Sequence, residues 1–375
     1  MNISSLHLWA PGFTEFGGGI TAFSRELASA LKPDIHDLRL FGKKDHSGVW
    51  SGIPLQGTGG VPGRLQSPAF AGKLILNGWV EPPQLVVSTH LNFGPAAALL
   101  KKHRNTPYIL VAHGVDVHPN LSKSRLSAIR QADCILAVSE WTRQKVIALG
   151  GVDSDRIGVL PNTYDEDRFT PKAKSEELLQ RYDINESDQV VLTVARIEKA
   201  EGYKGHDLVM KAVSTLLSSG QSVKLIVVGK GNDKERLVQM ADDLGIRASV
   251  SFTGFVPDEE LAAHYQLADV FAMPSSGEGF GIVFLESMGC GTPVLAGNRD
   301  GSVDALDGGR LGVLVDPSSA DEITRGLNQL LQNEGPKLWS NREELSSEVR
   351  QTFGRTAFRD RLNSHLSQLS INPAV

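Results

Sequence analysis

Residues 269–297 read DVFAMPSSGEGFGIVFLESMGCGTPVLAG. An apolar run at 269–273 is followed by a polar, glycine-rich turn, a helical pattern over 282–289 that stops at glycines, and a second apolar run at 293–296. Short apolar runs are typical of buried parallel strands, and a helix between two of them indicates a βαβ unit. The stretch therefore predicts a parallel sheet with a helix packed on it.

The same alternation of apolar runs and helical patterns extends along most of the chain, which predicts an α/β fold of doubly wound, Rossmann-like domains. Further strands are expected at 3–9, 85–90, 108–112, 134–138, 157–160, 190–197, 223–228, 250–255 and 312–315. Further helices are expected near 20–31, 140–149, 206–218, 233–244, 258–267 and 320–332. Residues 42–70 are dense in Gly, Pro and Ser and are predicted to form a long loop.

The length of 375 residues exceeds the usual size of one hydrophobic core and favours two domains. A polar stretch with two prolines, 161–175, separates the two series of strands and helices. We therefore predict an N-terminal domain over 1–165 and a C-terminal domain over 166–350. Ligands of such domains bind at the carboxyl ends of the strands, so functional residues are expected directly after strands.

The composition narrows the class of partner. A formal net charge of -5 argues against nucleic acid and favours small molecules. The two cysteines, Cys134 and Cys290, have neither a disulfide framework nor metal-ligand spacing and are predicted to be buried thiols. The N-terminal residues resemble no export signal, and apolar runs stay shorter than the roughly 18 residues of a membrane span. We expect a cytoplasmic protein.

Two features of the first half follow candidate strands. Gly17, Gly18 and Gly19 precede a helix, where the backbone can approach an anion, although a flexible turn is the commoner reading of such glycines. His113 ends a strand and is followed by Asp116, which is close enough in sequence to accept a hydrogen bond from an imidazole or a sugar hydroxyl. The alternative is a polar residue that only closes the strand.

In the second half, Arg196 and Lys204 follow a strand and together suit a diphosphate, whereas the alternative is a solvated loop. The quoted stretch places backbone amides at a helix N-terminus, with Glu278 before the helix and Glu286 about one turn into it. Both glutamates can then face one ligand. The alternative is one loop acid and one solvated acid.

Five short motifs occur in a fixed order along the chain and together indicate a family. GGG, HGVD, LPNTYD, ARI with YKGHDL, and EGFGIVFLE occur in this order through roughly residues 3 to 365. With them the chain resembles the retaining glycosyltransferases of family 4 type, also called glycosyl transferases group 1, which have the GT-B architecture of two Rossmann-like domains facing across a cleft. The segment 351–375 resembles the family's C-terminal helix, which packs back on the first domain.

The resemblance implies transfer of a sugar from a nucleoside diphosphate sugar to a hydroxyl of a glycan, glycolipid or other acceptor, in polysaccharide or glycoconjugate biosynthesis. It implies neither a required metal nor another cofactor. His113 and Glu278 would be catalytic, near the reacting face and the hydroxyls of the donor sugar. The donor-binding set would be Gly18, Gly19, Arg196, Lys204, Phe255, Val256, Gly279, Phe280, Gly281 and Glu286. In that set Arg196 and Lys204 hold the diphosphate and Glu286 the ribose.

The sequence leaves three alternatives open. Lys199 lies in the same loop as Lys204 and is the alternative phosphate ligand. A nucleotide-sugar epimerase on the same scaffold, or a non-catalytic subunit that binds sugar nucleotides, would share the donor-binding residues. The basic cluster KKHR at 101–104 is either a solvated surface or a peripheral contact with the inner face of a membrane, where family members meet lipid-linked acceptors.

Overall fold

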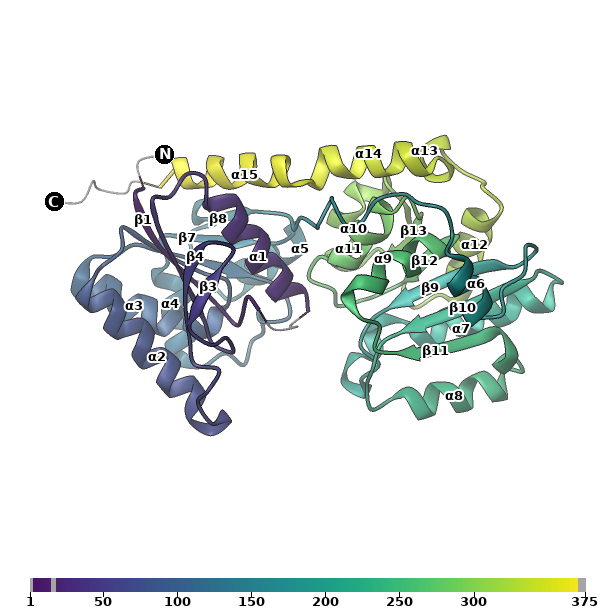
Figure 1. Cartoon of the computed structure of the whole chain (residues 1–375), viewed down its shortest axis with the longest axis horizontal. Helices are drawn as coiled ribbons and strands as arrows, with labels where there is room; N and C mark the ends of the chain where they lie inside the picture. Colours follow the sequence, from purple (N-terminus) through teal and green to yellow (C-terminus); the bar gives the residue numbers. More distant parts are fainter. Residues whose placement is uncertain (1–2, 15–17, 370–375) are drawn as a thin grey trace. The chain divides into compact units, whose positions relative to one another are not determined.

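The computed structural model describes residues 3–14 and 18–369 (Figure 1). The chain divides into two compact units, residues 1–164 together with 355–375, and residues 165–354. The sequence predicted boundaries after 165 and 350. Each unit is built around its own sheet.

The first unit contains an eight-stranded sheet in the order β3-β4-β2-β1-β5-β6-β7-β8. Its strands are β1 Ser5–Ala10, β2 Asp37–Gly42, β3 Gly48–Trp50, β4 Ile53–Gly57, β5 Leu85–Ser88, β6 Tyr108–Ala112, β7 Cys134–Ala137 and β8 Ile157–Val159. Its helices are α1 Gly19–Leu31, α2 Gly63–Val80, α3 Gly94–Arg104, α4 Lys123–Gln131, α5 Glu140–Ala148 and α15 Arg355–Ser367. The strands β5, β6 and β7 are buried along their whole length, because helices cover both faces of the sheet, and this explains their continuous apolar sequence.

The prediction of a long loop over 42–70 is wrong. Strands β3 and β4 form an antiparallel hairpin, closed by Ser51 and Gly52 with positive φ angles of 47° and 78°. Two left-handed residues between strands are what a tight hairpin turn requires. Helix α2 then begins after Pro62 and contains Pro68, while Phe70 and Leu74 anchor it in the core. Packing of its buried face outweighs the hydrogen bond that Pro68 cannot donate.

The second unit contains a six-stranded, fully parallel sheet in the order β11-β10-β9-β12-β13-β14. Its strands are β9 Gln189–Val194, β10 Val223–Val228, β11 Val250–Gly254, β12 Val270–Met273, β13 Val294–Gly297 and β14 Val313–Val315. Its helices are α6 Glu176–Arg181, α7 His206–Ser218, α8 Lys234–Asp243, α9 Asp258–Leu267, α10 Ile282–Gly289, α11 Ser302–Ala305, α12 Ala320–Leu331, α13 Lys337–Ser340 and α14 Arg342–Phe353, with a 3-10 segment η3 at Lys199–Lys204. The α/β prediction is confirmed in both units.

The strand order of each sheet contains one switch point, a pair of neighbouring strands from which the connections run in opposite directions. From β9 the chain adds β10 and β11 on one side and then crosses to add β12 on the other, so β9 and β12 are neighbours with diverging connections. In the first unit the same relation holds between β1 and β5. Crevices at the carboxyl ends of such strand pairs are the usual ligand sites of doubly wound sheets.

Helix α15 packs on the first unit. Phe358 contacts the ring of Phe23 edge-on at 5.8 Å, and Arg355 donates to Glu26 at 2.9 Å, both on α1. Nowhere in the described residues is there a helix with the length and apolarity to cross a bilayer.

Candidate functional site

The switch point of the second unit holds an ion pair between Lys204 and Glu278. Lys204 ends η3 after β9, and Glu278 lies in the turn after β12, so neighbouring strands bring together residues 74 positions apart. Their side chains are only 13% and 18% exposed. Burial lowers the pKa of the Lys204 ammonium, but the charge and the hydrogen bond of Glu278 raise it above its ordinary value. The result is a buried ammonium, charged at neutral pH, at the carboxyl ends of β9 and β12.

The other predicted cations differ in environment. Arg196 is 75% exposed and forms an ion pair with Glu201, a largely buried residue of the same loop. Lys199 is exposed at the start of η3, and its backbone N–H donates to the Asn232 side chain at 2.9 Å. The structure thus brings Lys204, rather than Lys199, into contact with Glu278.

Asp300 shapes the turn that contains Glu278. This carboxylate, which is 2% exposed, follows β13 and accepts hydrogen bonds from the Ser275 hydroxyl at 2.7 Å and the Glu278 amide at 2.7 Å. Its other oxygen accepts from the Ser302 amide at 2.9 Å. Asp300 was not predicted from the sequence, although its position in the segment after a strand was the available signal.

The turn ends in the N-terminus of α10. Gly281 has φ of +92°, and a Cβ atom at this position would lie 2.3 Å from the Phe284 ring, so only glycine fits. Phe280 is buried against Phe353 at 5.7 Å and fixes the preceding residue, Gly279, in a buried position. The first amides of α10 have no partner within the helix ladder, and its dipole favours negative charge there.

Glu286 lies in the second turn of α10 and accepts a hydrogen bond from the Tyr265 hydroxyl at 2.8 Å. Burial raises the pKa of this carboxyl to about 7, although the Tyr265 hydrogen bond and the charge of Arg168 lower it. The carboxyl therefore ionises near neutral pH. Tyr265 was not predicted from the sequence.

Phe255 and Val256 follow β11, at the same carboxyl edge but two strands from β9. Phe255 is 51% exposed, and the Lys230 ammonium lies 4.7 Å from the centre of its ring. An exposed ring beside a cation offers a stacking surface for a planar group.

In the first unit, the buried His113 ring donates from Nε2 to the Thr89 carbonyl at 3.0 Å, which leaves Nδ1 as its acceptor nitrogen. Burial lowers the pKa of His113 to about 4, so the imidazole is neutral. Asp116 accepts from the backbone N–H of His113 at 2.8 Å, and not from the imidazole. Phe23, on α1, packs edge-on against the imidazole at 5.1 Å.

The glycine motif precedes α1. Gly18 caps this helix with φ of 69° and ψ of -162°, a conformation almost confined to glycine, and Gly19 is its first residue. Gly17 lies outside the described residues. Asp45, which is fully buried, holds the loop upstream by accepting from the backbone amides of Phe13 and Thr14, both at 2.8 Å. This carboxylate was also missed.

Comparison with known proteins decides the family. Residues 174–352 match the model described as glycosyl transferases group 1, and residues 18–163 match the glycosyl transferase 4-like domain. The chain belongs to this glycosyltransferase family. It is 35% identical over 231 residues to the GDP-mannose-dependent alpha-(1-6)-phosphatidylinositol monomannoside mannosyltransferase of Mycolicibacterium smegmatis, a match covering 58% of this chain and 59% of the relative.

Another curated relative matches this glycosyltransferase over a similar length. It is 31% identical over 269 residues to the D-inositol 3-phosphate glycosyltransferase of Corynebacterium jeikeium, which covers 66% of the chain and 64% of the relative. The matches thus span about three fifths of the length of these curated relatives, 59% and 64%. Among solved structures, Anabaena HepE in complex with UDP and glucose has a TM-score of 0.77 at 19% identity. The match covers 97% of this chain and 100% of HepE. Sucrose-phosphate synthase from Thermosynechococcus elongatus also has a TM-score of 0.77, at 20% identity over 97% of this chain and 98% of that one. The predicted GT-B fold class is confirmed.

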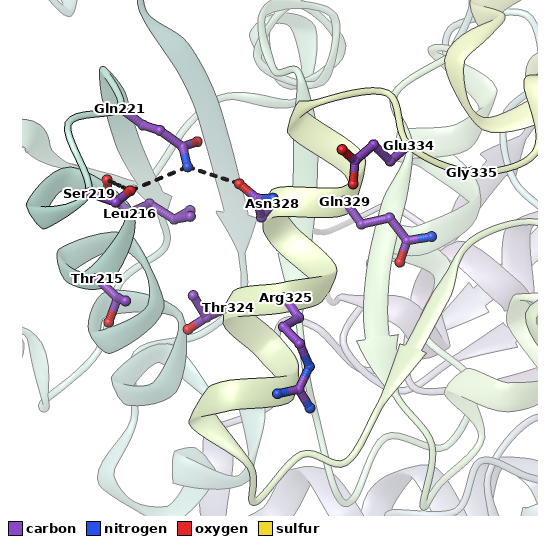
Figure 2. Close-up of a pocket in the computed structure, with 10 residues that line it drawn as sticks. All are labelled: Thr215, Leu216, Ser219, Gln221, Thr324, Arg325, Asn328, Gln329, Glu334 and Gly335. Atoms are coloured by element: carbon purple, nitrogen blue, oxygen red, sulfur yellow. Dashed lines mark hydrogen bonds between the residues drawn. The ribbon is translucent and has the colours of Figure 1, made fainter.

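A separate groove of 690 Å³ lies between α7 and α12 of the family member (Figure 2). Gln221 bridges it, donating to Asn328 at 2.9 Å. Because Gln221 lies two residues before the start of β10 at Val223, this groove is at the amino ends of the strands, and none of the candidate site residues lines it. No group of three or more His, Cys, Asp or Glu side chains within 3–14 and 18–369 is arranged to hold a metal ion.

Proposed function

We propose that this chain transfers a sugar, with retention of configuration, from a nucleoside diphosphate sugar to a hydroxyl of a glycan, glycolipid or other acceptor. The observation that supports this best is the buried Lys204–Glu278 pair at the switch point between β9 and β12. A cation fixed there, beside the N-terminus of α10, suits a diphosphate without a metal ion. Polysaccharide or glycoconjugate biosynthesis is the corresponding cellular role.

The proposed chemistry is a charge-stabilised displacement. A donor phosphate takes the place of the Glu278 carboxylate at Lys204, and Glu278 then accepts hydrogen bonds from the sugar hydroxyls. The bond between the acceptor oxygen and the anomeric carbon forms as the bond from that carbon to the phosphate oxygen breaks. The acceptor proton passes to the leaving phosphate on the same face, which preserves the configuration. Lys204, Arg196 and the amides of Gly279, Phe280 and Gly281 stabilise the charge that develops on the phosphate.

The remaining residues have binding roles in this proposal. Glu286 accepts from the ribose hydroxyls and Phe255 and Val256 meet the base. Gly18 and Gly19 allow the backbone of the first unit to approach the phosphates or the acceptor. His113, being neutral, meets the sugar as a hydrogen-bonding group rather than as a cation. The names of the relatives support GDP-mannose as the first donor to test and phosphoinositol compounds as the first acceptors.

The proposal is tested by release of nucleoside diphosphate from GDP-mannose and, in parallel, UDP-glucose, with phosphatidylinositol vesicles or D-inositol 3-phosphate as acceptor. We expect acceptor-dependent release, an NMR spectrum of the product with retained anomeric configuration, and the same rate in EDTA. Glu286→Ala should weaken donor binding by about 2 kcal/mol, or roughly 30-fold. Isomerisation of the donor without an acceptor would instead identify an epimerase. Donor binding without turnover in every assay would indicate a non-catalytic subunit.

We also propose that the acceptor is met at a membrane, through a surface formed by α2 and α3. Leu76, Trp79 and Val80 on α2 are 63%, 44% and 66% exposed. The last turn of α3 places the Arg104 guanidinium 5.6 Å from the centre of the Trp79 ring, and Lys102 is exposed on the same turn. Large apolar side chains beside cations suit the interface of a membrane with anionic lipids. A peripheral position at the inner face of the membrane follows from this proposal.

Flotation with anionic vesicles tests this surface. Lys101 is already paired with Asp133 at 2.7 Å, so Lys102 and Arg104 are the better targets. Changing both to Gln should reduce the floated fraction several-fold, since each cation near an anionic surface contributes about 1 kcal/mol. Trp79→Ala should also reduce it. The control, Lys211→Gln with Lys234→Gln, removes the same charge from exposed positions of the second unit. Equal flotation of all variants would refute the proposal.

A further inference from the structure

Tyr265 is a buried tyrosine whose hydroxyl is directed at the carboxylate of Glu286. It lies on α9, is fully buried, and donates to Glu286 Oε2 at 2.8 Å. A tyrosine hydroxyl in an apolar environment needs a hydrogen-bond partner, and here that partner is a carboxylate on the neighbouring helix α10.

The position of this hydroxyl is fixed from several sides. The Tyr265 ring packs edge-on against Phe169 and tilted against Phe271, with both ring centres 5.7 Å away. Its backbone carbonyl accepts from the Thr292 hydroxyl at 2.7 Å. A ring held in this way has one orientation, so the hydroxyl defines where Glu286 Oε2 lies.

We propose that Tyr265 is a positioning residue for the donor, which holds one oxygen of Glu286 so that the carboxylate presents the other to the ribose. This inference rests on the proposed function. It assigns a role to a residue that touches Glu286 and not the donor itself. A carboxylate restrained in advance loses less conformational entropy when it binds the ribose hydroxyls.

Because charged groups surround Glu286, this role of Tyr265 should be detectable in the pH dependence of donor affinity. Arg168 lowers the pKa of Glu286, Asp258 and Asp165 raise it, and the Cys290 thiol lies at the end of the same helix. Burial raises the pKa to about 7, whereas the Tyr265 hydroxyl lowers it by donating to the charged form. Below this pKa the carboxyl is protonated and is a poorer acceptor. Donor affinity should therefore rise with pH and level off above about 7.

The test is Tyr265→Phe, which keeps the ring and removes only the hydroxyl. Binding of GDP-mannose and of UDP-glucose is measured by calorimetry from pH 5.5 to 9, without acceptor. Sugar nucleotides are preferable to free nucleoside diphosphates, because a terminal phosphate would itself titrate near pH 6. Loss of one charge-assisted hydrogen bond should move the midpoint of the binding curve upward by about one pH unit. Affinity would then fall about fivefold at pH 7 through the shifted midpoint, and a smaller loss would remain at pH 9, because the ionised carboxylate is no longer restrained.

The control is Tyr182→Phe, which removes another tyrosine hydroxyl that contacts α9, bonded to His264 at 2.8 Å. It should leave the midpoint unchanged. In a Glu286→Gln background, Tyr265→Phe should have no further pH-dependent effect. Equal midpoints for Tyr265→Phe and the unmodified chain would overturn the role of Tyr265 but leave the proposed function standing. If Glu286→Gln binds donor as well as the unmodified chain, or if neither donor binds, the proposed function fails as well.

Discussion

The Lys204→Ala variant is expected to transfer sugar with kcat/KM lowered by about 100-fold, which corresponds to about 3 kcal/mol of transition-state stabilisation. The Lys204 side chain is only 13% exposed, so water screens its charge little, and it lies at the β9–β12 switch point. The bound diphosphate is already anionic and gains further negative charge as the sugar departs, so the loss should appear in kcat as well as in donor affinity. Truncation also removes the partner of Glu278, which adds to the effect.

Steady-state kinetics with the donor identified in the transfer assay provide the measurement. Lys199→Ala is the matched control, because Lys199 begins the same η3 segment but is exposed. It should change kcat/KM by less than about threefold, as expected for a screened surface charge. Lys204→Arg should restore part of the rate. A large loss in Lys199→Ala together with normal kinetics in Lys204→Ala would transfer the phosphate-binding role to Lys199.

The sequence was sufficient to predict the strands of the second unit and its helices α7, α8, α9, α10 and α12, because their signals are local, whereas α6, α11, α13 and α14 were not predicted. Strand β12 is buried on both faces and is therefore continuously apolar, and α10 ends at Gly289 as predicted. The same reasoning failed over 42–70. There glycine and proline were counted as breakers, whereas Gly52 closes a hairpin and Pro68 lies inside a helix. Tertiary packing, which decides such cases, leaves no periodic signal in a short segment.

The candidate site shows the same limit. Lys204 and Glu278 were predicted because each lies in the segment that follows a strand, and their contact is set by the adjacency of β9 and β12. Tyr265 and Asp300 were missed because each acts through a residue more than 20 positions away, at separations of 21 and 22. A buried polar residue can be recognised as a partner only when the strand order is known. The sequence thus predicts the residues proposed to touch the ligand better than the residues that hold them.

Asp300→Asn should destabilise the second unit by about 3 kcal/mol, because Asp300 is a buried acceptor for three donors. One carboxylate oxygen serves the Ser275 hydroxyl and the Glu278 amide, and the other serves the Ser302 amide. An asparagine has one acceptor oxygen, so its NH₂ group must face a donor on one side. The turn that carries Glu278 would lose its anchor, and donor binding should weaken together with stability.

Thermal unfolding followed by calorimetry should show the transition of residues 165–354 lowered by about 5 to 10 °C. Donor binding is then measured well below that transition, so that a loss reports the turn rather than unfolding. Asp316→Asn is the matched control: this carboxylate also organises a loop, accepting from the Ser318 amide at 2.9 Å, but it is partly exposed and apart from Glu278. It should shift the transition by no more than about 3 °C. If the Asp300→Asn variant has the thermal transition and the donor affinity of the unmodified chain, Asp300 does not hold the turn. A buried acceptor of three hydrogen bonds cannot lose one acceptor oxygen without lowering both stability and donor affinity.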